Sequence, residues 1–420
     1  MIRYIVKRMI SMVILLFGIS FISFLIMQLA PGNYLDILKL NPHITKRVLH
    51  EMERQFGLNK PWYVQYYRWI RGILPHPQHW KKYNWWNLHY WWTWNIHSWR
   101  AFNFGISFAY REPIAKVLWH PMINTLVLAI AITIVSWAIA LPLGTLSAVK
   151  QGKYFDQATI FYSYIGYAIP DFFLALLVLF LAARAKLFPF HDAIPILEII
   201  SLIIAVLGGF FSLQHQPGKK EKWRQWTENI FRFLGGSILT GILSFSILLG
   251  VYYLFQKANF PIGGATSPDY YFLSPWGKFL DLLRHLALPT LVESVVSVAY
   301  MLRQMRASTL EVLRAEYVTT ARAKGVTEKN VIFKHVFRNA LNPIITLFGF
   351  QLGSLISGIL TIEIVMNWPG LGYLIYRAIL EKDLYLVMGD VMISGLFLII
   401  GNLIGDILLA WSDPRIRYGS

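Results

Sequence analysis

The chain has 420 residues, of which 56% are hydrophobic and only 15% are charged. Soluble proteins spend about a quarter of their residues on charge, so this composition indicates membrane spans rather than soluble domains. The net charge of +17 is more typical of basic loops that face anionic lipid than of nucleic-acid binding. The absence of cysteine excludes disulfides, thiolate catalysis and Cys-ligated metal.

The N-terminal apolar run covers residues 9–29 and follows a basic start at Arg3, Lys7 and Arg8. It is longer than the apolar region of a cleavable signal peptide, which has about 7–15 residues. We therefore expect a retained first membrane helix whose N-terminus lies in the cytoplasm.

Later apolar runs of the length that a membrane helix needs occupy 122–149, 158–183, 194–213, 231–255, 285–302, 343–366 and 386–411. Pro142 and Pro170 fall inside two of these runs, where neighbouring helices can satisfy the freed carbonyls. Lys and Arg are about twice as dense in the predicted cytoplasmic pieces as in the short external loops. The sequence thus predicts an all-α integral membrane protein, a polytopic helical bundle of about eight transmembrane helices with both termini in the cytoplasm.

The segment 30–121 is too long for a simple external connection, so we expect it to hold structure of its own. Val48, Met52 and Phe56 recur at helical spacing within 45–56, and Gly57 follows. This pattern predicts a short surface helix with a glycine stop.

An aromatic stretch later in the same segment permits three interpretations. Trp and Tyr prefer the membrane–water boundary, so we favour a hairpin or helix on the outer leaflet. Indole faces also stack on sugars, peptides and cations, which would suit a substrate-guiding or partner-docking platform. A His-based metal site is the third interpretation, although no acidic or Cys ligand has matching spacing. The residues concerned are Trp80, Trp85, Trp86, Trp91, Trp92, Trp94 and Trp99, with His76, His79, His89 and His97 between them.

The polar segment 303–342 lies between two predicted spans and reads as a helical hairpin. Ser308 followed by Glu311 is a capping-box pattern, which predicts a helix start there. The apolar stripe of this helix would contain Leu310, Leu313, Tyr317 and Ala321.

The predicted hairpin turns at Gly325, which follows a basic last turn and suits a left-handed stop. Thr327 would cap a second helix that continues until Pro343 opens the next span. Such a hairpin suits either docking into a groove on a soluble partner or a solvated loop resting on lipid.

Acidic residues inside the predicted spans are candidates for a translocation path. Glu293 and Asp390 lie near mid-membrane, where a lipid-facing charge costs about 2.5–3.5 kcal/mol, so both should face the bundle interior. They would either line the route of a charged substrate or hydrogen-bond between helices, and we favour the structural role. Asp171, after Pro170, and Glu363 lie closer to span ends, and Asp406 near the inner end is expected to be structural.

The segment EYVTTARAKGVTEKNVIFKHVFRNALNPIIT, residues 316–346, resembles the EAA loop of permease subunits in binding-protein-dependent ABC importers. It is most similar to the B-type permease of the dipeptide, oligopeptide and nickel branch. Thr319, Thr320 and Ala321 stand where the general pattern has Glu-Ala-Ala, and Gly325 stands at its glycine. Supporting matches are Ala30-Pro31-Gly32, FGLNKPWYVQYYRWIRG (56–72), FGISFAYREPIA (104–115), IPDFF (169–173), LPTL (288–291), WPGLGYLIYRAIL (368–380) and DPRIR (413–417).

The resemblance implies a type I ABC importer permease core and a function in peptide import. The implied domains are an N-terminal transmembrane helix (1–29), an extracytoplasmic segment (30–121), and a permease core (122–420) with the coupling loop 303–342. The implied ATPase-coupling residues are Glu316, Tyr317, Thr319, Thr320, Ala321, Arg322, Lys324 and Gly325. The candidate translocation-path residues are Pro170, Asp171, Glu293 and Asp390.

The sequence contains no P-loop motif, so we expect no enzymatic activity and no cofactor or metal bound by this chain. The resemblance implies a second homologous permease, two P-loop ATPase subunits that bind ATP and Mg, and an extracytoplasmic substrate-binding protein. It also implies a location in the plasma membrane of a prokaryote. The same branch imports oligosaccharides or nickel, which remain alternatives. A stand-alone ion-coupled carrier should show inverted repeats, and the sequence has no convincing repeat.

Two stretches depart from the family. Residues 184–284 add an extra helix pair near 194–255, with a basic turn at Lys219, Lys220, Lys222 and Arg224. The Trp-rich stretch 75–101 also looks inserted. The resemblance assigns neither of them a role.

Overall fold

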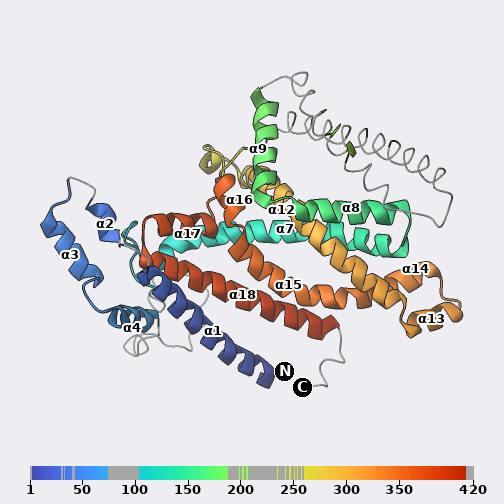
Figure 1. The fold of residues 1–420 in the computed structure, drawn as a ribbon, viewed down its shortest axis with the longest axis horizontal. Helices are drawn as coiled ribbons and strands as arrows, with labels where there is room; N and C mark the ends of the chain where they lie inside the picture. The colour runs from blue at the N-terminus through green and yellow to red at the C-terminus, as the bar shows by residue number, and fades with distance from the viewer. Residues whose placement is uncertain are drawn as a thin grey trace, which may run out of the picture. The chain divides into compact units, whose positions relative to one another are not determined.

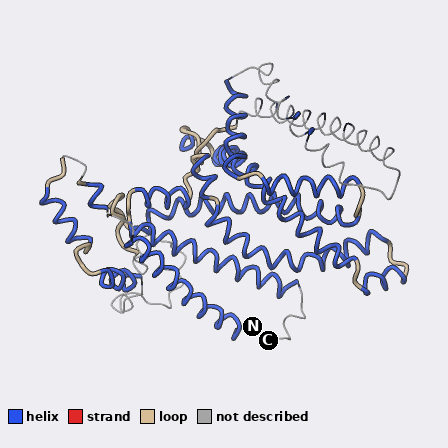
Figure 2. The backbone as a smooth tube through the Cα atoms, viewed as in Figure 1, coloured by secondary structure: helices blue, strands red, loops and turns tan. Residues whose placement is uncertain are grey.

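The computed structural model describes residues 2–73 except 30–31, 33 and 40–42, together with 104–187, 260–412 and a few isolated positions between 188 and 259. The described chain is helical, with short loops and one isolated antiparallel bridge between Ile106 and Pro113 (Figure 2). The predicted all-α class is confirmed. The chain divides into two compact units, Met1–Ile134 with Ser308–Ser420, and Val135–Ala307.

The first unit contains both ends of the chain and most of the described helices (Figure 1). It holds the start of α7 (Ile114–Val149) and the end of α12 (Pro275–Leu313). Its other helices are α1 (Ile2–Leu29), α2 (Tyr34–Leu38), α3 (Lys46–Phe56), α4 (Trp62–Ile73), α13 (Glu316–Ala323), α14 (Glu328–Asn330), the π-helix η4 (Val331–Phe337), α15 (Arg338–Gly358), α16 (Leu360–Val365), α17 (Leu371–Leu380) and α18 (Leu384–Ser412).

Glycines allow α15 and α18 to pack backbone against backbone. A Cβ added to Gly349 would lie 2.6 Å from the Cα of Asn402, and one added to Gly405 would lie 3.2 Å from the Gly349 nitrogen. On the other side of α18, a Cβ on Gly395 would lie 3.0 Å from a methyl of Leu16 in α1. Small residues at helix crossings are typical of membrane bundles, where close backbone contact replaces the hydrophobic effect.

The predicted surface helix at 45–56 is confirmed as α3. Gly57 has φ +69° and its N–H bonds to the Arg54 carbonyl, so the chain leaves the helix through a left-handed turn. Helix α4 then packs on α1, where Tyr66 contacts the rings of Phe21 and Phe24. The aromatic stretch 80–99 that follows α4 lies outside the described residues.

The second unit contains the end of α7, α8 (Tyr154–Ala168), α9 (Asp171–Leu187), the short 3-10 helix η3 (Tyr270–Phe272) and most of α12. Helices α8 and α9 are bent by 96° at Ile169 and Pro170. The expectation that Pro170 lies inside a continuous helix is therefore wrong, because the residue before a proline is pushed into extended backbone. Helix α8 packs on α12 at Gly166, where a Cβ would lie 2.7 Å from that of Ala299.

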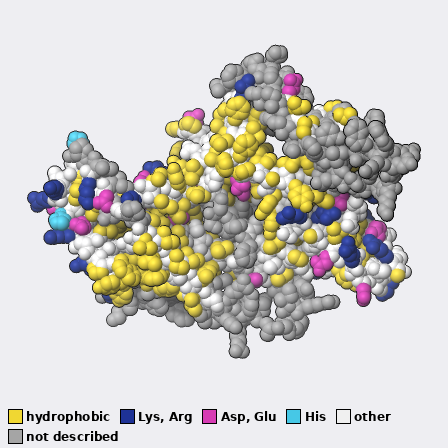
Figure 3. Space-filling view, in the orientation of Figure 1, with side chains coloured by type: hydrophobic (Ala, Val, Ile, Leu, Met, Phe, Trp, Pro, Cys, Tyr) yellow, Lys and Arg dark blue, Asp and Glu magenta, His cyan; other side chains and the backbone are white. Residues whose placement is uncertain are grey.

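Four helical spans of the described residues are long and apolar enough to cross a membrane, or five if α8 and α9 count as one bent span. They are Val13–Asp36, Ile114–Val149, Pro275–Leu313 and Leu384–Leu409. The predicted run 343–366 corresponds to α15 and α16, whereas 194–213 and 231–255 lie almost wholly outside the described residues. The total of about eight spans stays a prediction. Exposed hydrophobic side chains cover wide areas, while charged ones gather on α3 and around α13 and α14 (Figure 3).

Candidate functional site

The hairpin predicted at 303–342 begins later than the capping box suggests. Helix α12 runs unbroken to Leu313, and the Ser308 hydroxyl donates a hydrogen bond to the Ala340 carbonyl at 2.8 Å. The prediction of a helix start at Ser308 is therefore wrong, because Ser308 lies inside α12 and the residues before it are already helical. The break comes at Ala315, whose extended backbone (ψ 141°) precedes α13.

The turn of the hairpin follows the prediction. Gly325 has φ +77°, its N–H bonds to the Arg322 carbonyl at 3.0 Å, and the Val326 N–H bonds to the Ala321 carbonyl at 3.3 Å. A residue with a Cβ is strained in this left-handed region. Thr327 stands at the N-cap position of α14, but its side chain makes no capping hydrogen bond.

A small valine core holds the hairpin together. Val318 of α13 and Val331 and Val336 of η4 are completely buried. The partly buried residues packed on this core are Val312, Leu313, Ala315, Ala321 and Val326. The core fixes α13 against η4, so the hairpin presents one defined outer surface.

Most of the predicted coupling residues lie on that outer surface. Those exposed to solvent are Glu316, Tyr317, Thr319, Thr320, Arg322, Lys324 and Gly325. Ala321 is only partly exposed and packs toward the valine core, away from the stripe on which the sequence placed it with Tyr317. The difference arises within α13, because the side of this helix that faces the core contains Val318 and Ala321, while Tyr317 is exposed.

An ion pair closes the outer side of the turn. The Arg322 guanidinium donates two hydrogen bonds to the Glu328 carboxylate, at 2.7 and 3.1 Å, and so joins α13 to α14 across Gly325. This hydrogen bonding holds the pKa of Glu328 below its ordinary value. This pair was missed from the sequence, although opposite charges six residues apart on either side of a glycine turn could have indicated it.

The second helix of the hairpin contains a π-helical segment that the sequence did not predict. Residues Val331–Phe337 form η4, and the chain continues directly into α15 through Pro343. The expectation that Pro343 interrupts the helix is wrong. Its missing N–H frees only the Asn339 carbonyl, and membrane helices tolerate such a loss.

A buried ion pair joins helices in the second unit. Arg306 of α12 donates two hydrogen bonds to Asp156 of α8, at 2.6 and 2.9 Å. The Ser147 hydroxyl and the Gly152 N–H also donate to Asp156, at 2.6 and 2.8 Å. Sequence reasoning missed this cluster, because nothing local links residues so far apart in the chain.

Three of the four candidate path residues, Pro170, Asp171 and Glu293, lie in the second unit. Asp171 is the first residue of α9, directly after the bend at Pro170, and it interacts electrostatically with Glu293 of α12. The Glu293 Oε2 atom is buried and has no hydrogen-bond partner among the described residues. The expected hydrogen bond from Glu293 to another helix is therefore not seen at this atom.

The remaining acids of the spans lie in the first unit. Glu363 is completely buried and accepts hydrogen bonds from the Thr125 hydroxyl at 2.6 Å and from the Tyr373 N–H at 2.9 Å. It thereby ties the start of α17 to α7, which is a structural role. Asp390 is 2% exposed, and its Oδ1 atom has no partner among the described residues.

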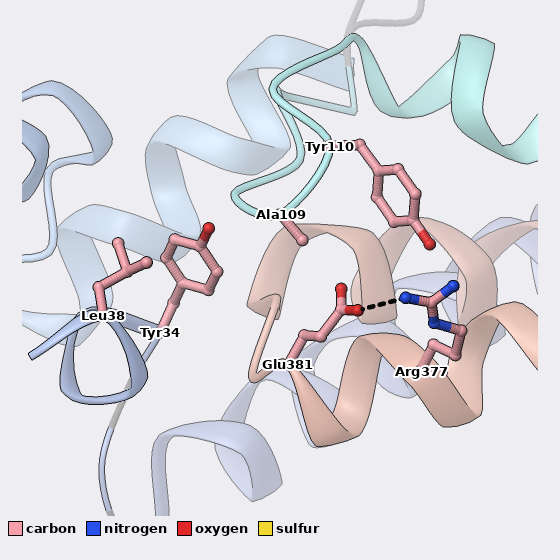
Figure 4. A pocket seen from close by; sticks show the side chains of 6 residues that line it. All are labelled: Tyr34, Leu38, Ala109, Tyr110, Arg377 and Glu381. Carbon is pink, nitrogen blue, oxygen red and sulfur yellow. Dashed lines mark hydrogen bonds and ion pairs between the residues drawn. The ribbon is translucent and has the colours of Figure 1, made fainter. Parts of the chain in front are cut away.

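An open cavity of about 320 Å³ lies in the first unit (Figure 4). Its lining combines two tyrosine rings with an ion pair between Arg377 and Glu381, at 3.0 Å. Burial raises the pKa of the Tyr110 phenol in this lining. The six lining residues are Tyr34, Leu38, Ala109, Tyr110, Arg377 and Glu381. Across the described part of the chain, no three His, Asp or Glu side chains are grouped to hold a metal ion.

Comparison with known proteins identifies the family. Residues 140–418 match the family described as binding-protein-dependent transport system inner membrane component, and residues 1–129 match its N-terminal companion. The chain is 29% identical over 419 residues to the oligopeptide transport system permease protein AppB of Bacillus subtilis, with all of both chains covered. It is 26% identical over 426 residues to the di/tripeptide transport system permease protein DppB of Pseudomonas aeruginosa, covering 100% of this chain and 99% of the relative.

A third relative, the dipeptide transport system permease protein DppB of Escherichia coli K12, is 25% identical over 418 residues, again with 99% of the relative covered. The matches run from one end of the chain to the other and include the hairpin and the helices on both sides of it. This multi-pass membrane protein belongs to the family of binding-protein-dependent transport system inner membrane components.

Proposed function

We propose that this chain is a permease subunit of an ATP-driven importer and that its cargo is di- or oligopeptides. The observation that carries the proposal is the full-length match to permeases named for oligopeptide, di/tripeptide and dipeptide transport. Oligosaccharide or nickel import by the same machinery is less well supported, since none of these three relatives is named for either cargo.

We propose that the outer surface of α13 and its glycine turn docks on an ATPase subunit. The hairpin is suited to pass a movement of the ATPase on to the membrane helices, because its valine core and the Arg322–Glu328 ion pair hold α13 and the α14–η4 segment together. Exposed Tyr317 and Lys324 offer an aromatic ring and a charge on that surface. ATP-driven movement of the ATPases would then favour one packing of the membrane helices over another.

The remaining parts of the importer would be a second permease, two ATPases and an extracytoplasmic binding protein. This chain would supply half of the path and no catalytic group, with ATP and Mg held by the ATPases. The two termini and the hairpin would lie in the cytoplasm, as the distribution of Lys and Arg predicts. A stand-alone carrier would have no use for an exposed hairpin of this kind.

Reconstitution of the complete importer into liposomes tests the proposal. We expect ATP-dependent accumulation of a labelled dipeptide, and no accumulation when a non-hydrolysable ATP analogue is enclosed instead. Removing the binding protein should abolish uptake. Accumulation of nickel or an oligosaccharide, with no peptide uptake, would contradict the assignment of the cargo. Uptake without ATPases would contradict the importer mechanism.

A further inference from the structure

Helix α12 carries a stripe of polar side chains that the fold leaves unsatisfied. Thr290, Glu293 and Ser294 are spaced by three and four residues, so they share one face of the helix. Thr290 and Ser294 are 8% and 4% exposed. Among the described residues, the Thr290 Oγ1, Glu293 Oε2 and Ser294 Oγ atoms have no hydrogen-bond partner. Three adjacent buried polar atoms without partners are unusual, because each costs about 1–3 kcal/mol.

Helix α8, which leads into the bend before α9, contacts α12 at Val295, next to Ser294 in the chain. The Tyr162 hydroxyl of α8 donates to the Val295 carbonyl at 3.0 Å, which fixes α8 beside this part of α12. Asp171 begins α9 directly after the 96° bend and interacts electrostatically with Glu293. The Glu293 and Asp171 carboxylates therefore influence each other electrostatically within predicted membrane spans, and the described residues provide no hydrogen-bond donor for the Glu293 Oε2 atom.

The backbone adds one more acceptor near this stripe. Pro289 lies inside α12 and has no N–H, so the His285 carbonyl lacks its ordinary helical partner. The proline is one helical turn, about 5.4 Å, before Glu293 on nearly the same face. Carboxylates, hydroxyls and a backbone carbonyl are all acceptors that suit a cation carrying several N–H donors.

We propose that Glu293, Asp171, Thr290 and Ser294 form a transient site for the α-ammonium group of the transported peptide. This inference rests on the proposed function, because it takes peptides as the cargo. The ammonium is the cation that every peptide with a free amino end shares, whatever its side chains. It has three N–H donors, and its charge offsets the repulsion between the two carboxylates. The Thr290 Oγ1, Glu293 Oε2 and Ser294 Oγ acceptors have no hydrogen-bond partner among the described residues when no peptide is bound, so they can hold the ammonium group while the peptide passes along the path.

The test compares Ala-Phe with propionyl-Phe, which differ only in the ammonium group. The importer without its binding protein is placed in lipid nanodiscs, and peptide binding is measured by saturation-transfer NMR. We expect Ala-Phe to bind about tenfold more tightly than propionyl-Phe, as suits a charged hydrogen-bonded group. Glu293→Gln, which keeps the shape of the side chain, should remove most of this difference. Asp171→Asn should reduce it.

The matched control is Asp269→Asn, which removes a carboxylate from an exposed position in the same unit and should leave the difference unchanged. Should Glu293→Gln fail to assemble, Ser294→Ala carries the test and should reduce the preference. The ammonium site would be overturned if the wild type showed no preference for Ala-Phe. It would also be overturned if the assembled Glu293, Asp171 and Ser294 variants kept the full wild-type preference. ATP-dependent uptake of Ala-Phe by the complete importer is measured in parallel. If this uptake fails, the proposed function is wrong and the ammonium site falls with it, whereas uptake without an ammonium preference overturns the ammonium site alone.

Discussion

The Arg306 guanidinium and the Asp156 carboxylate form a two-pronged ion pair, with N–O distances of 2.6 and 2.9 Å, that joins α12 to α8. The Asp156 side chain is 3% exposed and that of Arg306 is 21% exposed. Water therefore has little access to the carboxylate, and either partner would be left as an uncompensated charge if the other were removed.

We predict that Asp156→Asn lowers the stability of the subunit by about 3 kcal/mol, because it leaves a half-buried guanidinium unpaired. The measurement is thermal unfolding of the purified permease complex in detergent. Adding Arg306→Met should restore part of the loss, because an apolar side chain of similar length needs no partner.

The surface pair of Arg47 and Glu51 is the control for this prediction. Their side chains are 87% and 67% exposed, so Glu51→Gln should change stability by less than about 1 kcal/mol. Equal losses of stability in Asp156→Asn and Glu51→Gln would show that the buried ion pair contributes no more to stability than the surface pair. An additive double variant would show that Arg306 and Asp156 are not coupled.

Gly370 gives a prediction about the first unit. A Cβ at this position would overlap the carboxylate of Glu363, which is bound to Thr125 and to the start of α17. We expect Gly370→Ala to destabilise the subunit by more than about 3 kcal/mol, since a buried carboxylate must lose its partners to make room. The measurement is the amount of folded subunit recovered from membranes, followed by its melting temperature.

Gly18 is the matched position for this comparison, because a Cβ there would meet nothing within 4 Å. Gly18→Ala lies in α1 and should be neutral or stabilise by up to about 1 kcal/mol through helix propensity. Normal recovery and melting of the Gly370→Ala subunit would mean that the carboxylate of Glu363 can move at little cost.

The features that could be predicted from the sequence are those set by residues next to one another in the chain, such as helix ends. The stop of α3 at Gly57 and the turn at Gly325 both follow from glycine in the left-handed region after a helix. The break at Ala315 could not be predicted in this way, because no glycine or proline marks it. The capping-box pattern at Ser308 was misleading, since α12 had already begun before it.

Tertiary contacts explain most of what the sequence left open at the candidate sites. Glu363 and Glu293 look alike as single acids within apolar runs. Only the fold separates them, because Thr125 and the α17 backbone bind Glu363 while Glu293 Oε2 has no partner among the described residues. The Arg306–Asp156 pair depends equally on how helices pack, which no local pattern encodes.

The predicted orientation can be tested directly, because the chain has no cysteine to give background labelling. We expect Arg47→Cys to react with a membrane-impermeant maleimide from outside the cell. Lys329→Cys should react only after the cytoplasmic face is opened, because positive loops stay inside. Gly218→Cys should behave like Lys329→Cys if the extra helix pair near 194–255 exists. Labelling of Gly218→Cys from outside would contradict that pair.

The last prediction concerns coupling through the hairpin. Gly325 has φ +77°, and a Cβ there would meet no atom within 4 Å, so the cost of Gly325→Val is backbone strain rather than a clash. This strain is about 1–2 kcal/mol for a residue with a Cβ. It would shift α13 relative to α14 and misplace Tyr317 and Arg322 on the outer surface. We expect normal insertion and assembly, with loss of peptide-stimulated ATP hydrolysis and of uptake in the reconstituted importer.

Two further variants separate strain from location. Asparagine tolerates the left-handed region better than other residues, so Gly325→Asn should retain most of the stimulated hydrolysis. Gly264 has nearly the same backbone, φ +81°, and a Cβ there would meet only the Thr266 carbonyl, at 3.9 Å. Gly264→Val thus imposes similar strain far along the chain from the hairpin and should leave coupling intact. Full stimulated hydrolysis in Gly325→Val, or equal losses in Gly264→Val, would mean that the shape of the 316–325 turn does not carry the coupling.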